Sequence, residues 1–318
     1  MGGSHELPSK GGCLRGRWSA RAAVKGAGGA GATGALLTVA LYAANVGFNV
    51  LNKQTLTAVP DFPVWNTVLH FGVGSCLSLA AWALRLQRPP ASLSAGALEC
   101  ISPLVFLHCV AILFTNLAVA KVNLSLVHTI KAAEPFYAAC LSFLVLGIVP
   151  SAGALGCLAL IVSGVMMASI SEVSFTYVGF LAAMGSNLGF CLKNVLSKKL
   201  QADARVDELN LISLLTLGSL FVGLPFAIWR EGMNPPFGDA VVLVRGVSAG
   251  VLFHLYQIAS VLMLYRASPV THSVINIVKR PVLIVVSIAW FGTPVGWSNG
   301  LGLGCALLGC YAYSFSKR

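Results

Sequence analysis

Residues 268–291 read SPVTHSVINIVKRPVLIVVSIAWF, an apolar run long enough to cross a bilayer that carries two adjacent cations near its middle. Each such charge costs about 2.5–3.5 kcal/mol at the centre of a membrane helix on insertion scales. We therefore expect Lys279 and Arg280 to face an aqueous cavity, where they meet an anion. Two alternatives stay open: the side chains snorkel to the headgroup layer, or they neutralise a buried carboxylate.

The composition around this run is typical of a multi-span membrane protein. Of the 318 residues, 57% are hydrophobic and only 10% are charged, and the mean hydropathy is +0.82. The net charge of +11 does not indicate nucleic-acid binding, because most basic residues lie in the predicted leader, loops and tail, with no basic stripe interleaved with aromatic residues. The nine cysteines are scattered through apolar segments without a C-x-x-C pair, so we interpret them as small core residues.

Residues 1–32 form a basic leader without an apolar core. Five Lys and Arg residues stand there against the single acidic residue Glu6, amid Gly, Ala and Ser. This composition favours an organellar transit peptide over a secretory signal. The alternative is a basic tail on a protein that is not organellar.

We predict an all-α protein that crosses the membrane ten times. Ten apolar segments have roughly the 17–25 residues that a membrane-spanning helix needs, and the alternation typical of a membrane β-barrel is absent. The predicted spans are residues 34–52, 63–84, 98–119, 123–147, 152–170, 176–196, 208–229, 240–264, 270–291 and 297–315.

The two halves of the chain repeat one another. The pattern Asn-x-Gly-Phe at residues 45–48 recurs at 187–190, and Gly164 is matched by Gly309. Because each half holds five spans, an odd number, the second half must be inverted relative to the first. Inverted repeats are typical of secondary transporters, whose binding site lies near the membrane midplane. We predict one five-helix repeat over residues 33–172 and another over 173–318.

The fourth span mirrors the ninth in carrying a lysine and a proline. Lys131 lies in its first half and Pro135 follows. A proline inside a span removes a helical hydrogen bond and bends the helix. Glu134 follows Lys131 by three residues, so one possibility is that these two pair on the same helical face. Even then Lys279 and Arg280 are uncompensated, and a net cationic pocket of Lys and Arg suits a phosphate group.

Two hydroxyls near these charges, Thr115 and Tyr256, could bind the rest of a ligand, or they could be ordinary core groups. Lys193 lies near the end of the predicted sixth span, where we expect it to snorkel. The histidines are spread over separate spans, so we expect no metal site and no cofactor. No catalytic triad, phosphate-binding loop or carboxylate pair is present, which argues against an enzyme.

Over about residues 35–316 the chain resembles the plastidic phosphate translocators of the drug/metabolite transporter superfamily. The resemblance implies that Lys131, Lys279 and Arg280 hold a phosphate and that Thr115 and Tyr256 contact the organic part of the substrate. It also implies a transport unit that works as a monomer in the plastid (chloroplast) inner envelope membrane. The residues that carry the resemblance are Leu51–Gln54, Val127–Lys131 with Glu134 and Pro135, Ser186 and Asn187, Ser197–Lys199, His254–Gln257, and 268–274 with Lys279 and Arg280.

Within that family, residues 268–274 are most similar to the branch that exchanges phosphoenolpyruvate for phosphate. Ile112 stands where the triose-phosphate branch carries a histidine, which argues against a triose-phosphate specialist. Three residues depart from the family pattern: Lys193 replaces a usual arginine, Ile275 a usual glycine and Pro281 a usual aliphatic residue. We expect an antiporter of inorganic phosphate and a phosphorylated three-carbon compound. The alternatives are a triose-phosphate or other sugar-phosphate translocator, a nucleotide-sugar transporter of secretory membranes, and a membrane receptor that transports nothing.

Overall fold

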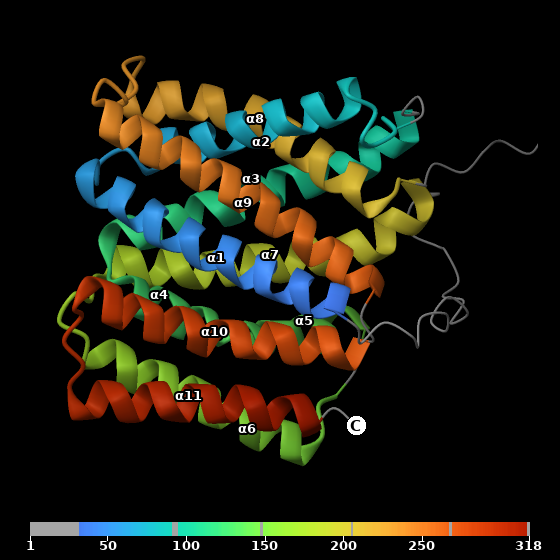
Figure 1. Cartoon of the computed structure of the whole chain (residues 1–318). Coiled ribbons are helices and arrows are strands. Elements are labelled where there is room, and N and C mark those ends of the chain that lie inside the picture. The colour runs from blue at the N-terminus through green and yellow to red at the C-terminus, as the bar shows by residue number, and fades with distance from the viewer. Residues whose placement is uncertain (1–31, 91–94, 147–148, 205, 267–268, 317–318) are drawn as a thin grey trace, which may run out of the picture.

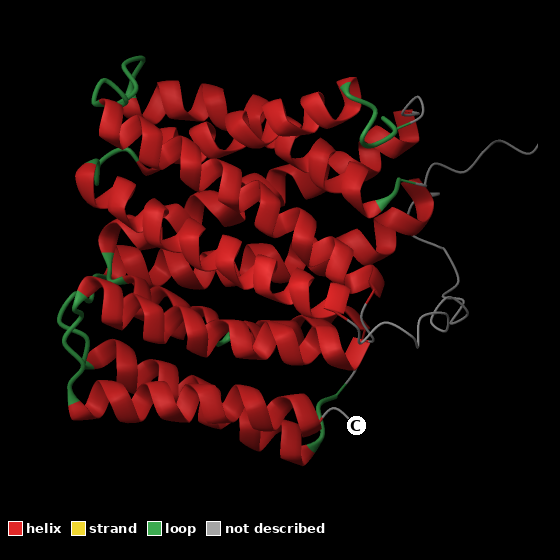
Figure 2. Ribbon diagram, viewed as in Figure 1, coloured by secondary structure: helices red, strands yellow, loops and turns green. Residues whose placement is uncertain are grey.

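The computed structural model describes residues 32–90, 95–146, 149–204, 206–266 and 269–316, and within these ranges the chain is helical with no strand (Figures 1 and 2). The predicted leader and residues 267–268 lie outside the described residues. The helices are α1 (Ala32–Ala58), α2 (Pro63–Ala83), α3 (Ala95–Lys121), α4 (Leu124–Lys131), α5 (Glu134–Leu146), α6 (Ala152–Ile170), α7 (Tyr177–Ala204), α8 (Glu208–Glu231), α9 (Ala240–Arg266), α10 (Pro269–Phe291) and α11 (Trp297–Ser316).

The predicted all-α class is confirmed. Within the described residues, five helices are long and apolar enough to cross a membrane, and they bury only about a third to a half of their side chains inside the protein. The rest of their apolar surface is exposed, as expected of helices that face lipid. The five are Pro63–Ala83, Ala95–Lys121, Ala152–Ile170, Glu208–Glu231 and Ala240–Ser260.

The helices run side by side in a stack, with the chain turning at either end (Figure 1). The most extensive pairings each join a helix from the first half of the chain to one from the second: α1 with α9, α2 with α8, α3 with α7, and α6 with α11. The helices α4 and α10 also pack together. The core therefore lies between the two halves of the sequence.

Small residues bring α6 and α11 into close contact. A Cβ atom on Gly164 would lie 2.7 Å from the carbonyl oxygen of Gly302, and one on Gly309 would lie 2.9 Å from the backbone nitrogen of Ile161. Helices in a membrane associate through such close backbone approach, because lipid gives no hydrophobic drive between them. This pair lies at one side of the stack, next to α10 and α4 (Figure 1).

The predicted fourth span is two helices, α4 and α5, separated by a turn at Ala132 and Ala133. Pro135 lies in the first turn of α5, where its missing N–H costs nothing. The carbonyl oxygen of Ile130 accepts a hydrogen bond of 2.9 Å from Asn187 Nδ2, and that of Ala132 accepts one of 3.0 Å from Cys310 Sγ. By contrast, α10 continues through Pro281 as one helix.

Candidate functional site

Lys131 ends α4 immediately before the turn and is buried, with 5% of its surface exposed. Its Nζ donates to Ser186 Oγ of α7 at 2.7 Å. Ser186 in turn is 2.7 Å from Thr115 Oγ1, and Thr115 donates to the carbonyl oxygen of Ala111 at 2.9 Å. Since Thr115 uses its proton on Ala111, Ser186 donates to Thr115, and the three side chains form one directed chain of hydrogen bonds. Sequence reasoning missed Ser186 as a site residue, although it is the residue that joins Lys131 to Thr115.

The second pair of predicted residues also meets. Lys279 Nζ, from α10, donates to the Tyr256 hydroxyl of α9 at 2.8 Å. Tyr256 packs at the edge of an apolar cluster that includes Ile112 and Phe190. This cluster forms an apolar wall beside the charges, because Phe190 lies 4.8 Å from Lys131 Nζ and Tyr256 accepts from Lys279. Ile112 is buried in that wall, and its aliphatic side chain offers no hydrogen-bond donor.

Arg280 forms an ion pair with Glu134 across α10 and α5, with its guanidinium nitrogen 2.8 Å from Oε2. The expectation that Arg280 is uncompensated was therefore wrong, and so was the alternative pairing of Glu134 with Lys131. The reason is the turn at residues 132–133: Glu134 begins a new helix, so its spacing of three residues no longer places it on the face of Lys131.

All four charged groups nonetheless belong to one site. Glu134 follows Lys131 across the turn between α4 and α5, Arg280 pairs with Glu134 at 2.8 Å, and Lys279 precedes Arg280 in α10, so the four charges lie close enough to interact. Three cations and one carboxylate leave a net charge of two positive units. The three predicted cations thus lie together with one carboxylate, Glu134, which was not expected to pair with Arg280.

Lys193 does not lie near the end of its helix, which was the basis for expecting it to snorkel. The helix α7 continues to Ala204, beyond the predicted end at residue 196, so Lys193 is well inside it. Its Nζ lies 5.4 Å from the centroid of the Phe190 ring, and Lys131 Nζ lies 4.8 Å from the same centroid. Lys193 and Lys131 therefore contact the same aromatic ring.

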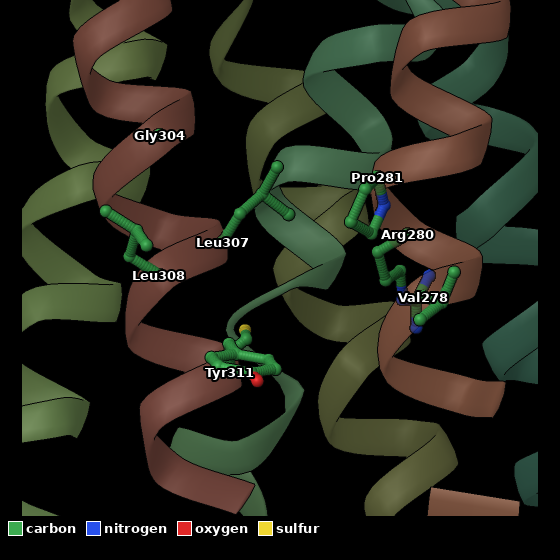
Figure 3. A pocket seen from close by; sticks show the side chains of 8 residues that line it. Val278, Arg280, Pro281, Gly304, Leu307, Leu308 and Tyr311 are labelled. Carbon is green, nitrogen blue, oxygen red and sulfur yellow. The ribbon is translucent and has the colours of Figure 1, made fainter. Parts of the chain in front are cut away.

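A separate apolar groove of about 360 Å³ runs between α10 and α11 (Figure 3). Arg280 lies at its inner edge, but the remaining lining offers no second charge, and Leu308 and Val278 are exposed beside it. The groove shares Arg280 with the cationic site, and most of its other lining residues are apolar. Its lining residues are Val278, Arg280, Pro281, Gly304, Leu307, Leu308, Cys310 and Tyr311.

Three comparisons place the chain among known proteins. The sequence model described as the Triose-phosphate Transporter family matches residues 33–314. The chain is 43% identical over 293 residues to a triose phosphate/phosphate translocator of non-green plastids from Brassica oleracea var. botrytis, covering 89% of this chain and 72% of that one. It is 44% identical over 292 residues to phosphoenolpyruvate/phosphate translocator 3, chloroplastic, from Oryza sativa subsp. japonica, covering 89% and 74%. A solved structure titled only as a crystal structure of a protein aligns with a TM-score of 0.55 at 16% identity, over 88% of this chain and 96% of that one, and shares the fold.

Proposed function

The chain belongs to the Triose-phosphate Transporter family, and from this we propose that it exchanges inorganic phosphate for phosphoenolpyruvate across the plastid inner envelope. Like its relatives, the protein is a transporter and not an enzyme. The observation that carries the proposal is the site between α4, α7, α9 and α10, whose net charge of two positive units matches a phosphate group carrying about −1.5 to −2 charges. The proposed ligands of the phosphate are Lys131, Lys279 and Arg280, with Thr115 and Tyr256 toward the organic part.

We propose that the described helices and the sequence repeat form ten spans in two inverted five-helix repeats, residues 33–172 and 173–318. The helix pairings support this, because α4 and α5 together make the fourth span. In this repeat α1 corresponds to α7 and α3 corresponds to α9. The pairing of α1 with α9 is therefore equivalent to the pairing of α7 with α3. The same correspondence leaves the pairings of α2 with α8 and α6 with α11 unchanged. In such an architecture the site between α4 and α10 lies where the two repeats meet.

Strict exchange follows from the charges. Closing the empty site would bury three cations against a single carboxylate, and the desolvation of an uncompensated ion costs several kcal/mol. A bound phosphate offsets that cost. Two of its oxygens can accept hydrogen bonds from the planar guanidinium of Arg280, while Lys131 and Lys279 act as point charges. Only the loaded transporter therefore moves between its two orientations.

Phosphoenolpyruvate is favoured over a triose phosphate because Ile112 presents no hydrogen-bond donor to the site. The names of the relatives include both substrates. A nucleotide-sugar transporter of secretory membranes is the second candidate, and the basic leader argues against it. A fluorescent fusion of the whole chain that reached secretory membranes instead of plastids would favour that candidate.

The test is phosphate exchange by the purified protein in liposomes. We expect Lys279→Ala and Arg280→Ala each to lower the uptake of labelled phosphate by about 10- to 100-fold, since each removes a charge-assisted contact of about 1.5–3 kcal/mol. Lys121→Ala is the control, because Lys121 sits at the end of α3 and its partner is the exposed Asp61 at 3.6 Å. If either site variant took up phosphate nearly as fast as the unaltered protein, the assignment of these residues to the phosphate site would be wrong.

A further inference from the structure

The helix α11 packs tightly on one face and is open on the opposite face. Gly302 faces α6, where an added Cβ atom would lie 2.7 Å from the carbonyl oxygen of Gly164. An added Cβ atom on Gly304 would instead meet nothing within 4 Å, and Gly304 lines the groove of about 360 Å³ between α10 and α11. Figure 3 shows Gly304 and Leu307 of α11 across this groove from Pro281 of α10. The open face of α11 is therefore one wall of the groove.

The inner edge of the groove reaches the cationic site. Arg280 lines the groove and also pairs with Glu134, the first residue of α5, at 2.8 Å. Cys310, another lining residue, donates from Sγ to the carbonyl oxygen of Ala132 at 3.0 Å, and Ala132 follows Lys131 in the chain. The groove and the proposed phosphate ligands therefore meet at Arg280 and at the α4–α5 turn.

The groove combines one charged group with an apolar wall. Among the described residues that line it, Arg280 alone is charged, and its guanidinium keeps further N–H donors besides the one that contacts Glu134. Val278 and Leu308 are exposed beside the groove, and in a membrane transporter such apolar side chains face lipid. The groove thus joins the lipid-facing surface to an anion-binding group. Neither inorganic phosphate nor phosphoenolpyruvate has an apolar tail that would fill it.

We propose that the groove binds a single-chain lipid phosphate from the bilayer, with its phosphate at Arg280 and its alkyl tail between α10 and α11. Charge complementarity identifies the headgroup, because a phosphate monoester carries about −1.5 to −2 charges and the cationic site has a net charge of two positive units. The proposal rests on the proposed function, because the headgroup occupies the proposed phosphate site. It adds a class of ligand that reaches this site from the membrane and competes with phosphate.

The experiment measures how alkyl phosphates inhibit the uptake of labelled phosphate into phosphate-loaded liposomes. Ethyl phosphate carries the headgroup with almost no tail, octyl phosphate carries both, and octanol carries the tail alone. Gly304→Leu fills the groove with a side chain. Gly156→Leu is the matched control, because an added Cβ atom there also meets nothing within 4 Å and Gly156 lies outside the groove.

We expect octyl phosphate to inhibit the unaltered protein and Gly156→Leu alike, and octanol to inhibit neither. For Gly304→Leu the half-inhibitory concentration of octyl phosphate should rise by about tenfold or more, equivalent to about 1.4 kcal/mol, because leucine occupies the space through which the tail leaves the site. That of ethyl phosphate should stay within about threefold, since its headgroup needs no groove. Comparing variants with the same reagent cancels the partition of that reagent into the bilayer.

Inhibition of Gly304→Leu by octyl phosphate as strong as that of the unaltered protein would overturn the groove as a binding site while leaving phosphate exchange in place. Inhibition by octanol as strong as that by octyl phosphate would overturn it too, because such an effect arises in the bilayer. Absence of phosphate exchange by the unaltered protein would instead overturn the proposed function, and the lipid phosphate site with it.

A photoreactive octyl phosphate gives an arm that needs no variant. A diazirine at the end of its tail should label the unaltered protein on α10 or α11 beside the groove. Excess inorganic phosphate should suppress this labelling, because both headgroups compete for Arg280. Labelling of other helices alone, or labelling that phosphate does not suppress, contradicts the proposal.

Discussion

At Arg280 the structure pairs a cation of α10 with the carboxylate of Glu134, at 2.8 Å. The pair is partly open, with 19% of the Arg280 side chain and 38% of the Glu134 side chain exposed, so the ion pair is accessible to an entering anion. The residues that carry charge could be predicted from the sequence, because a cation in an apolar run stands out. The partners of these residues could not be predicted. The pairing depends on a turn at two alanines, and alanine is not a residue that normally ends a helix.

Glu134→Gln should lower the melting temperature of the protein without ligand and increase the stabilisation that phosphate gives. The variant leaves Arg280 without its carboxylate partner, and a bound phosphate then relieves a larger excess of positive charge. Thermal unfolding with and without phosphate measures both effects. A phosphate-induced shift that is smaller than in the unaltered protein would argue that Glu134 does not act as the counter-ion of Arg280.

Among the elements, the α4–α5 turn is the one that shapes the site. It places Lys131 at the last position of α4 and frees backbone carbonyls that neighbouring helices must satisfy. Asn187 does so for Ile130 at 2.9 Å, one residue after Ser186, which binds Lys131. The sequence indicated a proline-bent helix here, but the interruption depends on side chains of α7 and α11, which lie far away in the chain.

Asn187→Leu should destabilise the protein by about 0.5–1.5 kcal/mol, because it removes the buried hydrogen bond from Asn187 to the carbonyl of Ile130 and leaves that oxygen with the backbone N–H of Ala133 as its one remaining donor among the described residues. Thermal or denaturant unfolding in detergent measures the loss. Asn194→Leu on the same helix is the matched control, since Asn194 is exposed. Equal stability of the two variants would mean that the turn does not need Asn187.

The glycine contact between α6 and α11 gives a second test at this scale. Gly164→Leu places a side chain against the backbone of α11, where neighbours cannot move aside, so we expect a loss of about 1–3 kcal/mol or more. Gly156→Leu is the control on the same helix, because a Cβ atom there meets nothing within 4 Å. A melting temperature for Gly164→Leu equal to that of the control would contradict this packing.

For the whole molecule, the helices themselves follow from the sequence, whereas their partners do not. The predicted span at residues 152–170 coincides with α6, because about 20 apolar residues are a signal that each segment carries alone. The pairing of α3 with α7 rests on fits such as Gly189 against Ala111, which involve two distant segments and no local pattern. Lys193 was likewise placed near a helix end, although α7 continues to Ala204 and Lys193 packs against Phe190.

The most direct test of the central claim, that an empty cationic site cannot close, is uptake of labelled phosphate into liposomes with and without internal phosphate. The desolvation of uncompensated cations predicts uptake at least about tenfold faster into phosphate-loaded liposomes, since even about 1.4 kcal/mol of extra barrier gives that factor. Equal initial uptake into liposomes that contain only chloride would show that the empty protein crosses freely. That result would contradict the coupling of charge neutralisation to exchange.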